Sequence, residues 1–313
     1  MLLASLGVLF GLALLTFAAD QFVVGATRVA ARLRLSAIVI GALVIGFGTS
    51  APEIVVSGLA AGRGQMDLAV GNVIGSNVAN LTLVLGTAAL IAPIGVRSRT
   101  LKREAPLSLV AVLLFAVLLQ GGLSIVDGTI LGIALLGSLA VILLSARGGD
   151  PEFEAEVGEF LTDALPKLPV EVTRTVLSLI AVLLSAQILV TSASTIAEGL
   201  GVAEGFIGLT VVAIGTSLPE LATAIQAARR RETDLIVGNL LGSNLFNATA
   251  VGTIISIAGP SEPVSASLAG LATWVMVAVA AIAFVFMVTG TRVARTEGAV
   301  LLIGYLAVLP LLA

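Results

Sequence analysis

The sequence contains neither cysteine nor histidine among its 313 residues, which excludes disulfide scaffolds, thiolate chemistry and imidazole metal sites. Charged residues make up only 11% of the chain, while hydrophobic residues make up 58%, and the mean hydropathy is +1.14. The chain also lacks a P-loop and any pattern typical of nucleic-acid binding. We therefore expect an integral membrane protein with no nucleotide, nucleic acid or soluble partner.

Apolar segments long enough to cross a bilayer, which takes about 20 residues each, recur along the whole chain. The predicted spans are 2–27, 36–62, 68–92, 104–121, 125–146, 172–197, 203–228, 234–258, 265–288 and 296–312. The first span lacks the basic flank of a cleaved signal peptide and is longer than one, so we expect it to be retained. The predicted fold class is an all-α integral membrane protein of ten transmembrane helices in the lipid bilayer.

Positive charges fall almost entirely on one side of the predicted spans. Fifteen of the sixteen Lys and Arg residues lie in loops that follow odd-numbered spans, and only Arg63 lies on the other side. Because cytoplasmic loops carry the excess of Lys and Arg, this pattern predicts a multi-pass protein of the cell inner (cytoplasmic) membrane with both termini extracytoplasmic.

Two motifs occur twice with the same offset of 167 residues. GTSAPE at 48–53 recurs as GTSLPE at 215–220, and GNVIGSNVAN at 71–80 recurs as GNLLGSNLFN at 238–247. Each half holds an odd number of spans, so the second copy enters the membrane from the opposite face. Two such inverted repeats are typical of secondary transporters. We divide the chain into a first repeat at 1–147, an acidic cytoplasmic linker at 148–169 and a second repeat at 170–313.

The first motif predicts a broken helix in each half. Pro52 and Pro219 have no amide hydrogen and clash with the carbonyl four residues earlier, which breaks helices 2 and 7 at Gly48 and Gly215. The freed carbonyls cannot face lipid and must line a cavity or meet a partner. Together with the neighbouring hydroxyls and one carboxylate, they offer the oxygen ligands that hard cations such as calcium and sodium prefer.

Glu53 and Glu220 close the two copies of this motif, deep inside apolar spans. An ionised carboxylate at the centre of a transmembrane helix costs roughly 2.5–3.5 kcal/mol. No basic residue lies in a span interior, so a bound metal ion or protons must compensate. The alternative is a protonated glutamate that only hydrogen-bonds between helices, but it does not explain the duplicated proline and hydroxyls.

The second motif, GN-x-x-GSN-x-x-N, adds small residues and asparagines on the next helix of each half. Its glycines and serines let helices approach closely, which is a packing role. Its six asparagines exceed what packing requires, and we expect at least one member of each set to be a ligand. The asparagines are Asn72, Asn77, Asn80, Asn239, Asn244 and Asn247.

The duplicated GTS-x-PE and GN-x-x-GSN motifs resemble those of the calcium/cation antiporters, specifically the prokaryotic sodium/calcium exchangers, over essentially the whole chain. The resemblance implies a transporter rather than an enzyme, without cofactors, which acts as a monomer and moves calcium and sodium by alternating access. It implies a calcium site made of Glu53, Glu220 and the main-chain carbonyls of Thr49 and Thr216. The long spans 1 and 6 would be the moving pair.

The same resemblance implies two sodium sites and a middle polar site. The outer sodium site would consist of Glu53, Ser76, Ser217 and the Ala213 carbonyl. The inner sodium site would consist of Glu220, Ser50, Ser243 and the Gly46 carbonyl. The middle site would hold Asn80 and Asn247, and this chain has Asn247 where several relatives and the potassium-dependent branch have aspartate, so we expect potassium-independent exchange.

Two other classes of function remain open on the sequence alone. A calcium/proton antiporter needs only that the facing carboxylates titrate. A passive channel or a membrane scaffold is the other class, although it would have little use for two inverted cation cradles. Asp20 is a further acid in the first span, where it either lines an ion path, pairs with a neighbouring helix or snorkels to the membrane interface.

Overall fold

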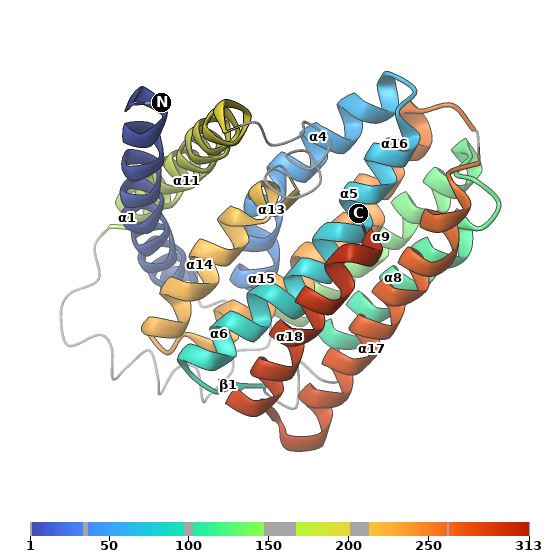
Figure 1. Cartoon of the computed structure of the whole chain (residues 1–313). Helices are drawn as coiled ribbons and strands as arrows, with labels where there is room; N and C mark the ends of the chain where they lie inside the picture. Colours follow the sequence, from blue (N-terminus) through green and yellow to red (C-terminus); the bar gives the residue numbers. More distant parts are fainter. Residues whose placement is uncertain are drawn as a thin grey trace.

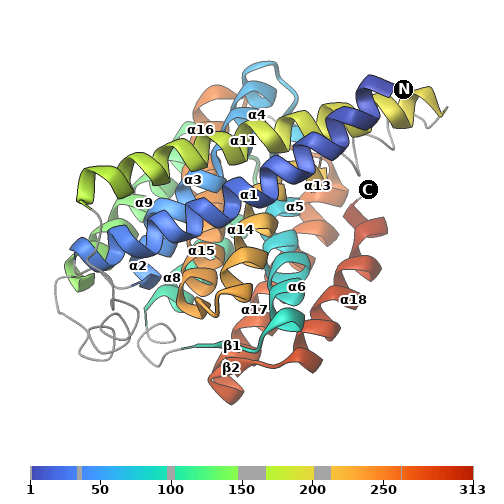
Figure 2. The same ribbon diagram turned by 90° about the vertical axis from the view of Figure 1, so that its left-hand side faces the viewer.

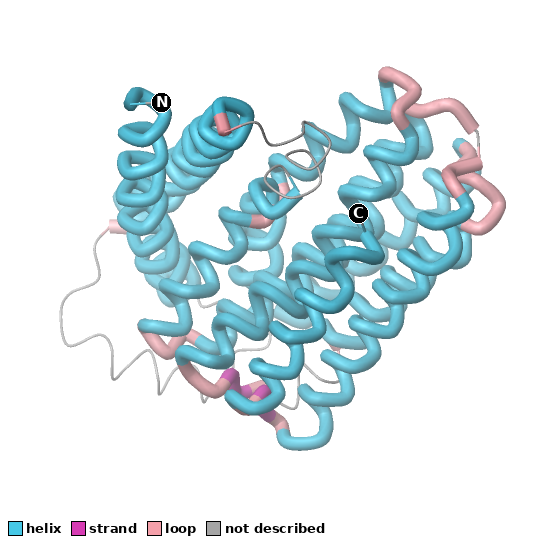
Figure 3. Tube along the Cα trace, in the orientation of Figure 1, coloured by secondary structure: helices cyan, strands magenta, loops and turns pink. Residues whose placement is uncertain are grey.

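The computed structural model describes residues 2–33, 37–96, 103–146, 167–200, 213–261 and 263–312. These residues are helical nearly throughout, and most of their loops lie at the two ends of a helix bundle (Figure 3). The predicted linker at 148–169 lies largely outside the described residues, as does the start of the predicted span 203–228.

The first half contains a long helix, a broken helix, a helix with a π-helical turn and two regular helices, followed along the chain as in Figure 1. They are α1 (Leu2–Leu33); α2 (Ala37–Ile40), η1 (Gly41–Gly46), α3 (Phe47–Thr49) and α4 (Ala51–Gly62); α5 (Met66–Ala79), η2 (Asn80–Val84) and α6 (Leu85–Ile91); α8 (Glu104–Leu119); and α9 (Ile125–Ala146). The short strand β1 (Ile94–Gly95) follows α6.

The second half repeats this order. Its elements are α11 (Leu168–Gly199); α13 (Ala213–Thr216) and α14 (Leu218–Arg229); α15 (Thr233–Phe246), η4 (Asn247–Val251) and α16 (Gly252–Ala258); η5 (Leu268–Ala272) and α17 (Thr273–Gly290); and α18 (Arg295–Leu312). The strand β2 (Arg292–Val293) pairs antiparallel with β1, with Ile94 opposite Val293. We call the end of the bundle that holds this pair the ribbon end.

The helices are those of a multi-pass membrane protein. Six helices of the described residues are long and apolar enough to cross a membrane, or seven if the bent pair Gly41–Thr49 and Ala51–Gly62 counts as one span. The bend within this pair is 48°. The all-α membrane fold is thus confirmed, while the full count of ten spans and the inverted relation of the halves stay predictions.

The two long helices α1 and α11 lie side by side and antiparallel along one face of the bundle (Figure 2). Glycines on α1 permit this close packing, because a Cβ added to Gly11 would lie 3.1 Å from the Leu189 backbone nitrogen and 3.2 Å from the Ser185 carbonyl oxygen. Polar contacts also join the two helices, since Arg28 of α1 pairs with the buried Glu171 of α11 at 3.3 Å and Arg174 of α11 donates to Gln21 Oε1 of α1 at 2.7 Å.

The first part of the broken helix of the first half, α2 and η1, packs against the second half. The π-helical segment η1 lies against α15, and the two backbones nearly touch. A Cβ added to Gly242 of α15 would lie 2.6 Å from Ala42 Cα, and one added to Gly46 would lie 3.0 Å from the Asn239 carbonyl oxygen. The halves therefore interlock, and the two copies of GTS-x-PE meet in the interior.

Candidate cation site

Both GTS-x-PE motifs form a helix break at their serine. α3 ends at Thr49 and α4 begins at Ala51, while α13 ends at Thr216 and α14 begins at Leu218. The break falls at Ser50 and Ser217, so the positions predicted at Gly48 and Gly215 were wrong by two residues. Proline is tolerated in the first turn of a helix, so each proline begins a new helix and the serine before that helix leaves the helical conformation.

Glu53 and Glu220 lie in the first turns of α4 and α14, and both side chains are fully buried. They lie on facing elements, because Ser50, three residues before Glu53, donates to Glu220 Oε1 at 3.2 Å. Each carboxyl group also has an oxygen, Oε2, without a hydrogen-bond partner in the described part of the chain. The structure therefore brings two acids from opposite halves together and leaves acceptor capacity on both.

Neither Glu53 nor Glu220 has a basic partner among the residues that the structure describes. Among the described residues four acids are buried, and the other two, Glu104 and Glu171, each pair with arginine. No Lys or Arg side chain is buried in the described ranges. Coulomb repulsion between two charges rises steeply in a low-dielectric interior, so the ionised pair needs a cation to neutralise it.

The residues of the expected inner sodium set lie close together. The Ser50 hydroxyl donates to Glu220 Oε1 at 3.2 Å, which joins the break of one half to the acid of the other. The Ser243 hydroxyl donates to the Gly46 carbonyl oxygen at 3.2 Å. Each contact joins an oxygen of the first half to an oxygen of the second half: Ser50 to Glu220, and Gly46 to Ser243.

For the expected outer sodium site, the structure shows one contact between its members. The Ser76 hydroxyl donates to Glu53 Oε1 at 3.3 Å. Ser217 is 1% exposed, and its hydroxyl has no hydrogen-bond partner among the residues that the structure describes. Ala213 begins α13, one turn before the break. A buried hydroxyl without a partner is costly in protein, so Ser217 is available as a ligand.

The asparagines of the second motif lie at the junction of the halves. Asn80 donates to Asn244 Oδ1 at 3.0 Å, and Asn244 donates to the Asn77 carbonyl oxygen at 3.3 Å. Asn247 is fully buried, and neither of its side-chain polar atoms has a partner among the described residues. Asn80 and Asn247 each begin a π-helical turn, η2 and η4, a feature frequent at functional sites.

A second layer of polar contacts supports the predicted calcium ligands. The Thr49 hydroxyl lies 3.3 Å from Asn239 Oδ1, and the Thr216 hydroxyl lies 3.5 Å from Asn72 Oδ1. Asn239 and Asn72 in turn donate to Thr223 at 3.4 Å and Ser57 at 2.9 Å. Sequence reasoning missed Thr223 and Ser57, although they follow Glu220 and Glu53 by three and four residues and so lie on the same helix faces.

Asp20 does not face the site. Its carboxylate forms an ion pair with Arg230, with Oδ1 2.6 Å from Nη2 and 2.8 Å from Nε. Of the three roles considered for Asp20, the structure therefore shows pairing with a neighbouring element, here with Arg230 in the turn after α14.

The chain matches the protein-family model described as "Sodium/calcium exchanger protein" over residues 3–144 and 172–312. It is 39% identical over 315 residues to "Putative antiporter CaxA" of Alkalimonas amylolytica, covering 98% of this chain and 97% of that protein. It is 32% identical to "Sodium/calcium exchanger MaX1" of Methanosarcina acetivorans, covering 97% of each chain.

The fold is similar to a solved structure of the sodium-calcium exchanger NCX_Mj soaked with 2.5 mM Na⁺ and 10 mM Sr²⁺. The TM-score is 0.87 at 30% sequence identity, and the similarity covers 99% of this chain and 98% of that one. The similarity thus extends over all the helices that build the site.

Proposed function

Because the chain belongs to the sodium/calcium exchanger protein family, which is a family of membrane cation/calcium antiporters rather than enzymes, we propose that it exchanges sodium for calcium. Sodium entering the cell drives calcium out across the inner (cytoplasmic) membrane by alternating access. The exchange is electrogenic and independent of potassium, and the protein needs no cofactor.

One observation carries this proposal: Glu53 and Glu220 are fully buried, lie on facing elements and have no basic partner among the described residues. Two carboxylates match the charge of one calcium ion. Their Oε2 atoms, which have no hydrogen-bond partner among the described residues, supply the charged oxygens that calcium prefers. In the proposed calcium site, Glu53 and Glu220 act with the carbonyls of Thr49 and Thr216.

Sodium competes for the same carboxylates. The contacts of Ser50 with Glu220 and of Ser243 with Gly46 support an inner sodium site made of these four residues. The contact of Ser76 with Glu53, and the Ser217 hydroxyl, which has no partner in the described part of the chain, support an outer site that also uses the Ala213 carbonyl. Since both ions need Glu53 or Glu220, filling the sodium sites expels calcium.

Asn247 supports independence from potassium. Because this position holds an amide instead of an aspartate, the centre has two carboxylates, Glu53 and Glu220. No group of three or more Asp or Glu residues suited to a metal ion occurs within the described ranges. With Asn80, Asn247 forms a neutral middle site. If more sodium charge enters than calcium charge leaves, each net charge gains roughly 2.3 kcal/mol per 100 mV from the membrane potential.

The ribbon end of the bundle faces the cytoplasm in this proposal, because fifteen of the sixteen basic residues follow odd-numbered predicted spans. Both termini are then extracytoplasmic, and the protein acts as a monomer in the bilayer. α1 and α11 move together against the remaining helices, which is supported by their close packing and by the Arg28–Glu171 ion pair and the Arg174–Gln21 hydrogen bond that join them.

Calcium flux into proteoliposomes tests the function. We expect calcium uptake when sodium is loaded inside, and none when only a potassium or proton gradient is imposed. Glu53→Gln and Glu220→Gln should each abolish this uptake, while Glu297→Gln, which removes a carboxylate at the start of α18, should not. Uptake driven by a pH gradient without sodium would instead identify a calcium/proton antiporter, and calcium flux without any counter-ion would identify a channel.

A further inference from the structure

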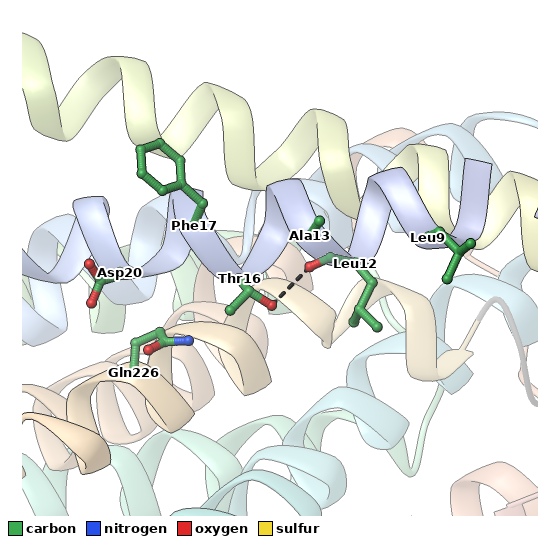
Figure 4. A pocket seen from close by; sticks show the side chains of 7 residues that line it. All are labelled: Leu9, Leu12, Ala13, Thr16, Phe17, Asp20 and Gln226. Carbon is green, nitrogen blue, oxygen red and sulfur yellow. Dashed lines mark hydrogen bonds between the residues drawn. The ribbon is translucent and has the colours of Figure 1, made fainter. Parts of the chain in front are cut away.

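The Asp20–Arg230 ion pair joins α1 to the turn that follows α14, two elements 210 residues apart in the chain. Asp20 also ends an open groove of about 590 Å³ between α1 and α14, which Figure 4 shows. The groove is lined by Leu9, Leu12, Ala13, Thr16, Phe17, Asp20 and Gln226. Four of its seven lining residues are apolar, and the ion pair lies at its polar end.

The inverted repeat gives this pair a counterpart on the other side. Adding the repeat offset of 167 residues to Asp20 gives Gln187 of α11, and subtracting it from Arg230 gives Arg63, which follows α4. The counterpart therefore keeps the arginine and replaces the acid with a neutral amide. In this structure Gln187 is exposed and donates within its own helix to Thr191 at 3.1 Å, and Arg63 is exposed without an ion pair to any described residue.

The packing of α1 and α11 differs between the two ends of the bundle in the same way as the Asp20–Arg230 and Gln187–Arg63 pairs do. α1 packs along α14, whereas α11 has no comparable packing against α4 in the described part of the chain. Leu59 of α4 is 56% exposed and Leu184 of α11 is 58% exposed. One moving helix thus closes against the α14 region at one end of the bundle, while the equivalent contact at the other end is open.

We propose that the Asp20–Arg230 ion pair is a latch that holds α1 closed over α14 and so favours the state open at the Arg63 end. This inference rests on the proposed function, because it assigns the pair to one of the two states of alternating access. α1 and α11 form one packed unit, so bringing α11 onto α4 requires α1 to leave Arg230. In the other state, Gln187 meets Arg63 as a neutral amide beside a charged side chain. That contact is weaker than the Asp20–Arg230 ion pair, so the state open at the Arg63 end is favoured.

The size of the effect follows from the exposure of the pair. The Asp20 side chain is 28% exposed and that of Arg230 is 42% exposed, so solvent screens the interaction. A partly exposed ion pair shifts a two-state equilibrium by roughly two- to five-fold. Loss of the latch should therefore increase the population in which α11 lies against α4 by this factor.

Distances between spin labels measure this population directly. The chain has no cysteine, so Leu59→Cys and Leu184→Cys give one labelled pair on α4 and α11, studied in lipid nanodiscs without calcium. Asp20→Asn and Arg230→Gln should each raise the short-distance fraction about two- to five-fold. Arg229→Gln, beside the pair and without an ion pair to any described residue, should leave the distribution unchanged.

The variant Gln187→Glu tests the latch without disturbing it. This change gives Arg63 an acidic partner, so it should also raise the short-distance fraction while Asp20 and Arg230 stay intact. It therefore still tests the latch if the Asp20 and Arg230 variants do not fold. Unchanged distances in Asp20→Asn and Arg230→Gln proteins that melt as the parent does, or in Gln187→Glu, would overturn the latch. Sodium-driven calcium flux in the unlabelled parent tests the proposed function separately.

Discussion

Replacing Gly242 with alanine tests the backbone contact on which the site is built. The added methyl carbon would lie 2.6 Å from Ala42 Cα and 2.7 Å from the Ala42 carbonyl oxygen, whereas carbon atoms pack at about 3.5–4.0 Å. Both neighbours are backbone atoms, so η1 as a whole must move away from α15. Overpacking of this kind costs about 1–3 kcal/mol of unfolding free energy.

The same movement reaches the proposed inner sodium site. Ser243 follows Gly242, and its hydroxyl donates to the Gly46 carbonyl at 3.2 Å. Moving η1 outward separates these two oxygens, which removes a contact worth about 1 kcal/mol, or about five-fold in sodium affinity. Calcium affinity should change less, because the proposed calcium site uses neither Ser243 nor Gly46.

Thermal unfolding in detergent and the sodium dependence of calcium release measure the two effects. Gly137→Ala is the matched control, because Gly137 is exposed on α9 and a Cβ there meets nothing within 4 Å among the described residues. We expect a lower melting temperature and a higher sodium requirement for Gly242→Ala only. If Gly242→Ala melts and transports as Gly137→Ala does, the close approach of η1 and α15 is not needed for the site.

Two further substitutions test other parts of the account. Glu171→Gln removes the acidic partner of Arg28 and Arg174 and should lower unfolding free energy by about 1 kcal/mol; an unchanged melting temperature would show that these ion pairs add no stability to the packing of α1 against α11. Asn247→Asp adds a third carboxylate to the central site beside Glu53 and Glu220, so the ion-free protein should melt earlier and regain stability with sodium or calcium. Equal melting temperatures with and without these ions would contradict a cation site at Asn247.

Much of the site could be predicted because the repeat and proline act locally. A proline removes one backbone donor wherever it stands, so the breaks beside Pro52 and Pro219 follow from the sequence to within two residues. A carboxylate inside an apolar span needs compensation in any fold, which directs attention to Glu53 and Glu220. The duplicated motifs then indicate that the two acids occupy equivalent places.

The partners across the halves could not be predicted in the same way. Helices that are apolar all round carry no polar face to show which neighbour they contact, so nothing in the spans indicates that η1 packs against α15. The π-helical turns at Asn80 and Asn247 change the helical period locally, and composition leaves no sign of them. The Asp20–Arg230 pair likewise depends on tertiary packing between residues 210 positions apart.

The central claim is that Glu53 and Glu220 bind one calcium ion between the halves, in competition with sodium. Equilibrium binding of radiolabelled calcium to the purified protein tests it most directly, with Glu297→Gln as the control. We expect sodium-displaceable binding in the parent and the control, and affinity at least about 30-fold weaker in Glu53→Gln and Glu220→Gln, the equivalent of about 2 kcal/mol. Calcium binding of unchanged affinity in either glutamine variant would contradict the account.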